Sequence, residues 1–443
     1  MCGFIVAGVG TDANDFFVRS RGPDAVGETT REELTFRHYL LHITGEKTPQ
    51  PFVDGEVICL FNGEIYNQPF MKSDGEVLIP LYRQFGVDFA KHLDGEFAIA
   101  LYDFGKRLAL FATDSFGTKP LFVNGIQCAS YPSAVPDGVR VPPNTTLVRH
   151  FSGRTEKSLT NFDFDFGHQS KETYDDWLSA FSRAVRKRAK PGCFITMSSG
   201  YDSGAIACEL LRQEANFRSY SVRAGEDLEI LQARVARTGG VLFHMTVDDY
   251  AQHTQFLRER VEPASFTLES GMTMHCDHLY HDAGAVGASF VFARARAEGH
   301  KIHHSGHGGD EITSDYSENP TISSLHGVYP KKLAPWRNFY GGCMRAYLTK
   351  EEHVAGAYGI ETRYPLLDSQ LVQEFLWLTP ELKNKQFKAP LHEYLSRSDF
   401  PFRAGFKEGF GAMHSLTPDD DPRLPELLSW IKPRDPVAAS DAP

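Results

Sequence analysis

The chain has 443 residues, more than the roughly 250–300 at which a single hydrophobic core stops growing, so we expect two domains. Hydrophobic residues make up 41% of the sequence and charged residues 23%, which excludes a disordered, collagen-like or membrane-embedded chain. The 57 acidic residues outnumber the 46 basic ones and give a formal net charge of -11. Neither nucleic acid nor an anionic membrane is therefore expected as the main partner, and small molecules are favoured.

The seven cysteines are scattered and form no C-x-x-C pair, a usage that fits a reducing cytoplasm. The N-terminal MCGFIVAGVG lacks the basic segment and cleavage site of a secretory signal, and no apolar run reaches the length of a membrane span. We therefore expect a cytoplasmic protein that does not enter the membrane.

Short β-rich runs separated by Gly, Asp and Asn turns occupy the first 150 or so residues. The clearest runs are Cys2–Val9, Glu56–Phe61, Glu96–Tyr102 and Arg107–Thr113, and one helix is expected at Glu76–Phe85. This pattern predicts antiparallel sheets with helices packed on them.

The hydrophobic period then becomes helical over Glu172–Ala189. Strands and helices alternate after it: strand Cys193–Met197, a helix from near Ser203 to Arg212, strand Phe217–Arg223, helix Asp227–Arg237 and strand Val241–Val247. Alternation with short connections predicts a parallel sheet that binds ligands beyond the carboxyl ends of its strands. The segment rich in Pro and Asp from about Pro418 to Pro443 is expected to be a loose tail.

Cys2 is the first candidate catalytic residue. Removal of Met1 would leave a thiol and a free α-amine on one residue, and an α-amine with a pKa of about 7.7–8.0 can accept the thiol proton. A cysteine at position 2 is weak evidence by itself, because a small residue that starts a buried strand also explains it.

The motif FNGEIYN (Phe61–Asn67) supplies an Asn side-chain amide followed by a Gly N–H, the donor pair of an oxyanion hole, at Asn62 and Gly63. Glu64, and Asp74 in the following SDGE, are anions able to hold an α-ammonium group. The alternative is an Asn-Gly turn with surface acids.

Taken in order, these motifs resemble the class II glutamine amidotransferases, the N-terminal-nucleophile glutaminases. RGPD (Arg21–Asp24), DGEFAIALYD (Asp94–Asp103) and DSFGTKPLF (Asp114–Phe122) are similar to stretches of asparagine synthetases. The resemblance implies that Cys2 attacks the glutamine side-chain amide, that Asn62 and Gly63 hold the oxyanion, and that Glu64 and Asp74 bind the glutamine α-amine. The family's carboxylate-clamping Arg is replaced by Leu41, and Arg37 or Arg21 is the candidate substitute.

A second motif is FITMSSGYDSGAIACELL, which predicts a buried strand, a small-residue loop and a helix. Such a loop can bring backbone N–H groups to an anion, although strand–loop–helix units are common. It resembles the pyrophosphate-binding loop of ATP pyrophosphatases, which implies ATP binding by Ser198, Ser199, Gly200, Asp202 and Ser203, with Asp202 as a Mg²⁺ ligand.

Three later blocks are similar to asparagine synthetases: SGHGGDE (Ser305–Glu311), IETRYPLLD (Ile360–Asp368) and KAPLH (Lys388–His392). By this resemblance Gly306 joins the nucleotide site, Asp310 is the second Mg²⁺ ligand, and Lys388 steadies the adenylate and the departing pyrophosphate. The family's Glu in S-G-E-G is His307 here. Together with Tyr201 and the changed loop ITSDY (Ile312–Tyr316), this replacement puts aspartate in question as the acceptor. A neutral His307 is still able to assist proton removal from attacking ammonia.

Histidines and one cysteine cluster at His275–His281 and at His300–His307, but neither group has the pattern of a structural zinc site. We expect an α+β glutaminase domain of the N-terminal-nucleophile type with stacked antiparallel sheets (1–165), an α/β ATP-pyrophosphatase synthetase domain (166–417) and the tail (418–443).

The resemblance implies a ligase that uses glutamine, ATP and Mg²⁺ to amidate a small carboxylic acid, either aspartate or another acid of specialised metabolism. The alternatives are a regulatory or binding homologue with reduced catalysis and an intramolecular amide (lactam) synthetase. A homodimer is left open.

Overall fold

The computed structural model describes residues 2–223, 227–268, 274–276, 278–317 and 322–405. These residues form two compact units. The first contains the chain up to Phe164 together with Ala355–Arg363, and the second contains the other described residues. The expected tail therefore lies outside the described part, as does the side chain of Cys276.

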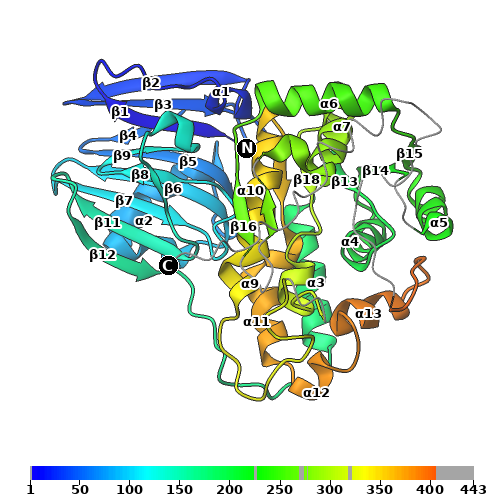
Figure 1. Cartoon of the computed structure of the whole chain (residues 1–443). Coiled ribbons are helices and arrows are strands. Elements are labelled where there is room, and N and C mark those ends of the chain that lie inside the picture. The colour runs from blue at the N-terminus through cyan, green and yellow to red at the C-terminus, as the bar shows by residue number, and fades with distance from the viewer. Residues whose placement is uncertain (1, 224–226, 269–273, 277, 318–321, 406–443) are drawn as a thin grey trace, which may run out of the picture. The chain divides into compact units, whose positions relative to one another are not determined.

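The described residues of the first unit form two antiparallel sheets, each with helices on its outer face (Figure 1). One sheet has the order β10-β8-β9-β1-β3-β2 and the other β12-β11-β7-β6-β5-β4. The strands of these sheets are β1 (Gly3–Gly8), β2 (Ala25–Arg31), β3 (Leu34–Leu40), β4 (Phe52–Asp54), β5 (Val57–Ile65), β6 (Gly95–Asp103), β7 (Leu108–Thr113), β8 (Phe122–Asn124), β9 (Gln127–Ala129), β10 (Val139–Arg140), β11 (Thr145–His150) and β12 (Thr155–Thr160). A further strand of this unit, β19 (Glu361–Arg363), belongs to neither sheet. The helices are α1 (Val18–Arg21), α2 (Leu78–Phe85) and the 3-10 turns η1 (Asp74–Val77), η2 (Gly86–His92) and η3 (Pro132–Ala134).

The alternation of side chains along the strands builds separate cores on the two faces of each sheet. Phe4 and Phe36 of one sheet pack with Leu60 and Tyr102 of the other to fill the space between them. The opposite face of the second sheet packs against α2 and η2, and the opposite face of the first against α1.

Asn62 and Gly63 do not form a turn. Strand β5 runs from Val57 to Ile65 and pairs with β6 along its whole length, with Asn62 opposite Ala98 and Gly63 opposite Phe97. Gly63 has φ +139, and a Cβ there would lie 1.8 Å from the Glu96 carbonyl oxygen, so a glycine is required for the strand to continue. The sequence prediction ended this strand at Phe61 because the Asn-Gly pair is a common turn signal.

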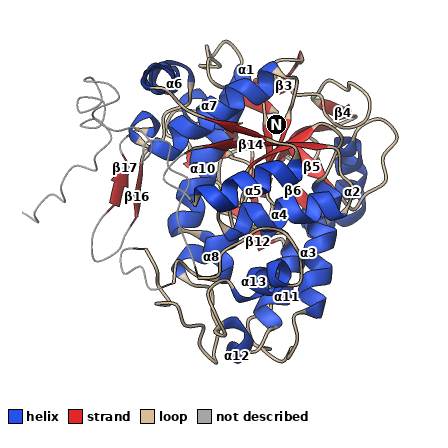
Figure 2. Ribbon diagram, turned by 90° about the vertical axis from the view of Figure 1, so that its right-hand side faces the viewer, coloured by secondary structure: helices blue, strands red, loops and turns tan. Residues whose placement is uncertain are grey.

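The second unit contains a parallel sheet in which β15-β14-β13-β18 are adjacent, covered by helices (Figure 2). Its strands are β13 (Cys193–Thr196), β14 (Phe217–Val222), β15 (Val241–Phe243) and β18 (Ile302–His304), with a separate antiparallel pair β16 (Phe266–Leu268) and β17 (Met274–Cys276). Its helices are α3 (Asp175–Arg188), α4 (Tyr201–Arg212), α5 (Leu228–Thr238), α6 (Val247–Arg260), α7 (Ala283–Ala297), α8 (Gly309–Thr313), α9 (Arg337–Tyr340), α10 (Gly342–Ala357), α11 (Ser369–Trp377), α12 (Pro380–Lys383) and α13 (Ala389–Ser396), with 3-10 turns η4 (Leu279–His281) and η5 (Pro365–Leu367).

The predicted fold class is confirmed: antiparallel sheets with helices in the first unit are followed by a parallel sheet with helices in the second. β14 and β15 are added on one side of β13, and β18, which follows them in the chain, is added on its other side. Loops that leave two such neighbouring strands diverge and create a binding crevice. No helix in the described residues is long and apolar enough to cross a lipid bilayer.

Candidate active sites

Cys2 lies at the start of β1 and is buried, with 8% of its surface exposed. The backbone N–H of Leu41 donates to Cys2 Sγ at 3.4 Å, and the buried Arg21 donates its Nε–H to the Cys2 carbonyl oxygen at 2.8 Å. Burial raises the pKa of the Cys2 thiol to about 11, so the thiol needs a nearby proton acceptor to become a nucleophile.

The side-chain amide of Asn62 is able to bind a ligand. The residue is fully buried, and neither its Nδ2 nor its Oδ1 has a hydrogen-bond partner among the described residues. A buried amide without partners costs about 1–3 kcal/mol, so such groups are rare unless a ligand satisfies them. His38 Nε2 lies 3.2 Å from the carbonyl oxygen of Phe61, directly before Asn62, and holds this part of β5.

Glu64 and Asp74, the two candidate amine-binding acids, lie together. Thr44 Oγ1 donates to Glu64 Oε1 at 2.6 Å, and the N–H of Ile65 donates to Asp74 Oδ2 at 2.9 Å. Burial, with the neighbouring Glu64 adding to it, raises the pKa of Asp74 to about 8. Asp74 is therefore largely protonated at neutral pH until a cation arrives.

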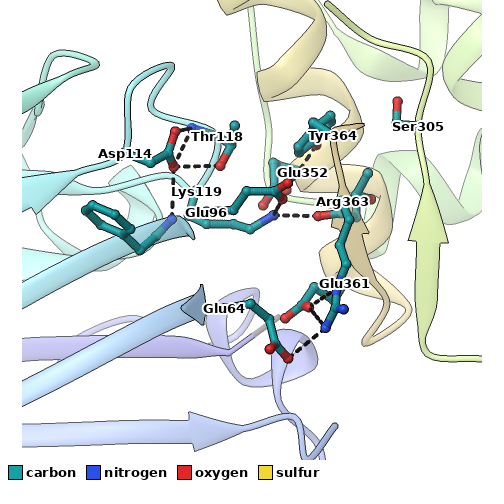
Figure 3. Close-up of polar contacts among 12 residues, drawn as sticks. Glu64, Glu96, Asp114, Thr118, Lys119, Ser305, Glu352, Glu361, Arg363 and Tyr364 are labelled. Carbon is teal, nitrogen blue, oxygen red and sulfur yellow. Dashed lines mark hydrogen bonds and ion pairs between the residues drawn. The ribbon is translucent and has the colours of Figure 1, made fainter. Parts of the chain in front are cut away.

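Sequence reasoning assigned no role to Glu361 and Arg363, although it singled out the block that contains them. Arg363 Nη2 lies 2.7 Å from Glu64 Oε1 and 2.8 Å from Glu361 Oε1, and all three side chains are buried (Figure 3). Lys119 holds the same segment through a 2.5 Å hydrogen bond from its Nζ to the Thr362 carbonyl oxygen. Only the folded chain brings residues 361–363 to Glu64.

The structure does not bring Arg37 to these acids. Arg37 Nε bonds Glu28 Oε2 at 2.6 Å and Nη1 lies 3.9 Å from Asp15, whereas its strand neighbour His38 faces Phe61. Arg21 is occupied by the Cys2 carbonyl and by Tyr131, whose hydroxyl oxygen accepts from Nη1 at 2.7 Å. The guanidinium that does lie beside Glu64 is that of Arg363.

The second site lies at the carboxyl ends of β13 and β18. These parallel neighbours lead into the loop before α4 and the loop before α8. A Cβ on Gly306 would lie 2.9 Å from Asp202 Cβ, and one on Gly309 would lie 2.1 Å from Asp202 Oδ1. Glycine at both positions lets the two loops approach each other closely.

Asp202, Asp310 and Lys388 meet in this crevice, although Lys388 follows Asp202 by 186 residues. Lys388 Nζ lies 2.5 Å from Asp202 Oδ2 and 3.1 Å from Asp310 Oδ1. Burial opposes the charged ammonium, but the two carboxylates outweigh it and raise the pKa of Lys388. Two carboxylates directed at one point are hard oxygen donors that suit Mg²⁺, whose other ligands would be phosphate oxygens and water.

Arg234 binds the backbone carbonyl groups of the loop before α4, and the sequence alone did not identify this residue. This fully buried guanidinium donates from Nη1 to the carbonyl oxygens of Ser198 and Gly200, at 2.6 and 2.7 Å. Ser203 Oγ accepts from the N–H of Ser198 at 3.0 Å. With its carbonyls bound on the Arg234 side, the loop can present N–H groups to an anion.

The loop before α4 and the carboxylates of Asp202 and Asp310 border a cavity of about 640 Å³. Its lining includes the expected nucleotide-site residues Ser198, Gly200, Asp202, Ser203, Gly306, Asp310 and Lys388, and it also includes Tyr201 and His307. Away from these residues the wall consists of small residues of α7 and of Tyr347, Lys350 and Glu351 on α10. Within the described residues, no three His, Cys, Asp or Glu side chains converge as metal ligands.

Comparison with known families assigns both units. Residues 11–145 match the model of a glutamine amidotransferase domain, and residues 176–333 match that of asparagine synthase. The yeast Saccharomyces cerevisiae protein named asparagine synthetase [glutamine-hydrolyzing] 1 is 26% identical over 93% of this chain and 79% of its own length. The chain belongs to the asparagine synthetase-like family.

Other members of the family align similarly. Asparagine synthetase B [glutamine-hydrolyzing] of Escherichia coli is 24% identical over 83% of this chain and 71% of its own length. Asparagine synthetase [glutamine-hydrolyzing] 2 of Arabidopsis thaliana is 27% identical over 83% of this chain and 67% of its own length. Cys2, Glu351 and Lys388 lie outside the two matched ranges.

Proposed function

We propose that the protein is a glutamine-dependent ligase that adenylates a small carboxylic acid with ATP and converts it to an amide. The observation that carries this proposal is the convergence of Asp202, Asp310 and Lys388 beyond the carboxyl ends of the parallel strands β13 and β18. Membership of the asparagine synthetase-like family supports it.

In the first unit, the amine exposed by loss of Met1 accepts the Cys2 thiol proton, and Sγ attacks the glutamine side-chain carbonyl. The amide of Asn62 and the N–H of Gly63 hold the resulting oxyanion. Collapse breaks the C–N bond, releases ammonia and leaves a thioester, which water hydrolyses to glutamate. Glu64 and Asp74 bind the α-ammonium of glutamine, and Arg363 sets the charge balance of this group.

In the second unit, Ser198, Ser199, Gly200, Ser203 and Gly306 bind the phosphates of ATP through the loops before α4 and α8. An acceptor carboxylate oxygen attacks the α-phosphorus, and pyrophosphate departs while Lys388 steadies the charge that develops on it. Mg²⁺, held by Asp202 and Asp310, would neutralise phosphate charge. Ammonia then forms the amide bond and displaces AMP.

The acceptor is aspartate or another small carboxylic acid. The wall of the cavity away from the nucleotide loops combines small residues of α7 with Tyr347 and Lys350, and Lys350 already pairs with Asp282 at 3.2 Å. This pairing reduces the positive charge available to a second acceptor carboxylate, which favours an acid other than aspartate.

The test is to mix purified protein, ATP, Mg²⁺ and glutamine with a panel of carboxylic acids that includes aspartate. Pyrophosphate release is measured, and amides are identified by mass spectrometry. We expect one acid to give AMP, pyrophosphate, glutamate and amide in equal amounts. Production of neither pyrophosphate nor glutamate with any acid would reject the ligase and favour a binding homologue.

A further inference from the structure

Glu351 of α10 is a buried carboxylate onto which three side chains converge. Ser305 Oγ donates to its Oε2 at 2.7 Å, His303 Nδ1 lies 3.2 Å from Oε1, and His307 Nδ1 is in closer contact with Oε2. Ser305 also accepts the backbone N–H of His307 at 3.1 Å, which fixes the start of the loop after β18. The cluster therefore orients the imidazole of His307.

One hydrogen bond and two close contacts with Glu351 indicate which ring nitrogens carry protons. His303 Nε2 accepts the backbone N–H of Thr196 at 3.4 Å, so the proton of a neutral His303 is on Nδ1 and faces Glu351. His307 also turns Nδ1 to Glu351, which leaves its Nε2 as an acceptor. The His303 side chain is 3% exposed and that of His307 is 29% exposed, and His307 lines the cavity.

Of these groups, His307 is the one suited to accept a proton. Burial opposes the ionised form of Glu351, but His307 and then His303 outweigh it and hold the pKa of Glu351 well below its usual range. A carboxylate so stabilised is a poor base. Burial disfavours the charged imidazole of His307, but Glu351 outweighs it and raises the pKa of His307, with Glu311 adding to this rise and Lys350 opposing it.

The rings of Tyr347 and Tyr364 lie almost parallel to the His307 ring, with centroids 6.0 and 6.5 Å away, and restrict its rotation. Tyr364 is itself fixed by a 3.0 Å hydrogen bond from its hydroxyl to Glu352 Oε1. The imidazole thus contacts Glu351 through Nδ1 and has two nearly parallel aromatic rings nearby, and its other ring nitrogen is left away from the carboxylate.

We propose that His307 is the base that takes the proton from the attacking nitrogen in the second unit, and that Glu351 is the positioning residue that fixes its reactive tautomer. The proposal rests on the ligase function proposed above. Attack of ammonia on the acyl-adenylate forms a C–N bond and an ammonium-like adduct. Nε2 of His307 accepts one N–H proton, the C–O bond to phosphate breaks, AMP leaves with the electron pair, and the imidazolium is stabilised by Glu351.

The arrangement is tested first without any substrate, by nitrogen-15 NMR of histidine-labelled protein. A His307→Gln variant identifies the His307 signals. We expect the Nδ1–H tautomer for neutral His307, and in Glu351→Gln we expect at least a tenfold weaker proton affinity of this ring. The matched control is Glu374→Gln, on α11 of the same unit, whose carboxylate pairs with Lys171 and which should leave the His307 titration unchanged. A neutral His307 with its proton on Nε2, or a titration unaffected by Glu351→Gln, would overturn the proposal.

The role in catalysis is tested with the acid that supports pyrophosphate release in the wild-type protein. His307→Gln should retain pyrophosphate formation and lose amide formation by about 10²–10⁴-fold, the usual contribution of a general base. Hydroxylamine, which is largely unprotonated at neutral pH, should still trap the acyl-adenylate as a hydroxamate. Absence of pyrophosphate from wild-type protein would reject the ligase function, whereas unchanged amide formation by His307→Gln would reject only the role of His307.

Discussion

In the first unit, Cys2, Asn62 and Glu64 lie on or next to sheet strands and are buried, whereas in the second unit Asp202 and Asp310 lie in the first turns of α4 and α8 beside a cavity. The buried acids of the first site also pair with Arg363 inside the protein. The second site is formed by loops that line a cavity and contribute less to the core. Substitutions in the first site should therefore affect folding and catalysis together, and those in the second should mainly affect catalysis.

The largest expected effect is that of Cys2→Ala. Loss of the nucleophile should reduce glutamine-dependent amide formation by about 10⁴-fold or more while ammonium salts still support it. Glutamate release and amide formation are measured separately, with Cys59→Ala, a buried thiol of the same unit, as the control that retains both. If ammonium-driven turnover is lost from a folded Cys2→Ala protein, the two sites do not work independently.

Asp202→Asn tests the second site. Removal of one charge from the pair that faces Lys388 should reduce pyrophosphate formation by about 10²–10³-fold, with glutamine hydrolysis and thermal stability little changed. Asp399→Asn, at an exposed ion pair with Arg237 in the same unit, is the matched control. Normal pyrophosphate release by Asp202→Asn would remove this residue from the nucleotide site.

Arg363→Met tests whether the first site is part of the core. Glu64 and Glu361 would be left buried without their cation, which should lower the free energy of unfolding of the protein by about 3–5 kcal/mol. Arg31→Met, which breaks a more exposed pair with Glu56, should cost at most about 1 kcal/mol. Chemical denaturation followed by fluorescence gives both values, and equal costs would contradict the proposed difference between the sites.

A smaller effect is expected from the raised pKa of Asp74, about 8. Below pH 8 the carboxyl group is mostly protonated, and binding of the glutamine ammonium requires its ionised form. The KM for glutamine should therefore fall by about tenfold between pH 6.5 and 8, since one pH unit corresponds to a factor of ten in proton occupancy. Asp74→Asn should bind glutamine weakly with no such dependence, and an unchanged pH profile in this variant would reject the role of Asp74.

The raised pKa of Asp74 also makes stability depend on pH, in the opposite sense to glutamine binding. Because the folded-state pKa of Asp74 exceeds the usual value of 3.8, the folded protein binds the proton more tightly than the unfolded chain does. The resulting stabilisation is present at low pH and is lost as the pH rises from about 4 to about 8.

Sequence patterns predicted the fold class well because local periodicity determines it. The strand at Cys193 and the loop after it were expected from a short apolar run followed by small residues, and the structure places β13 at Cys193–Thr196. The prediction of β5 ended too early at Phe61, since the Asn62-Gly63 pair has two local interpretations and only pairing with β6 decides between them.

Arg363, Glu351 and Arg234 could not be assigned from the sequence for a different reason. Each acts through a partner far away in the chain: Arg363 through Glu64, Glu351 through His307 and Arg234 through the carbonyl of Ser198. A charged residue alone in a sequence is most often solvated. The local sequence around Arg363, Glu351 and Arg234 does not distinguish them from charged residues that are exposed to solvent.

The first unit takes nine of its residues, Ala355–Arg363, from a late part of the chain. A Cβ on Gly356 would lie 2.3 Å from the hydroxyl of Tyr131, so this late stretch fits closely against residues made much earlier. When only the first 164 residues have been synthesised, Arg363 is not yet present to pair with Glu64. A protein fragment that ends at residue 164 lacks Arg363 altogether. Completion of this unit must therefore wait until most of the protein has been synthesised.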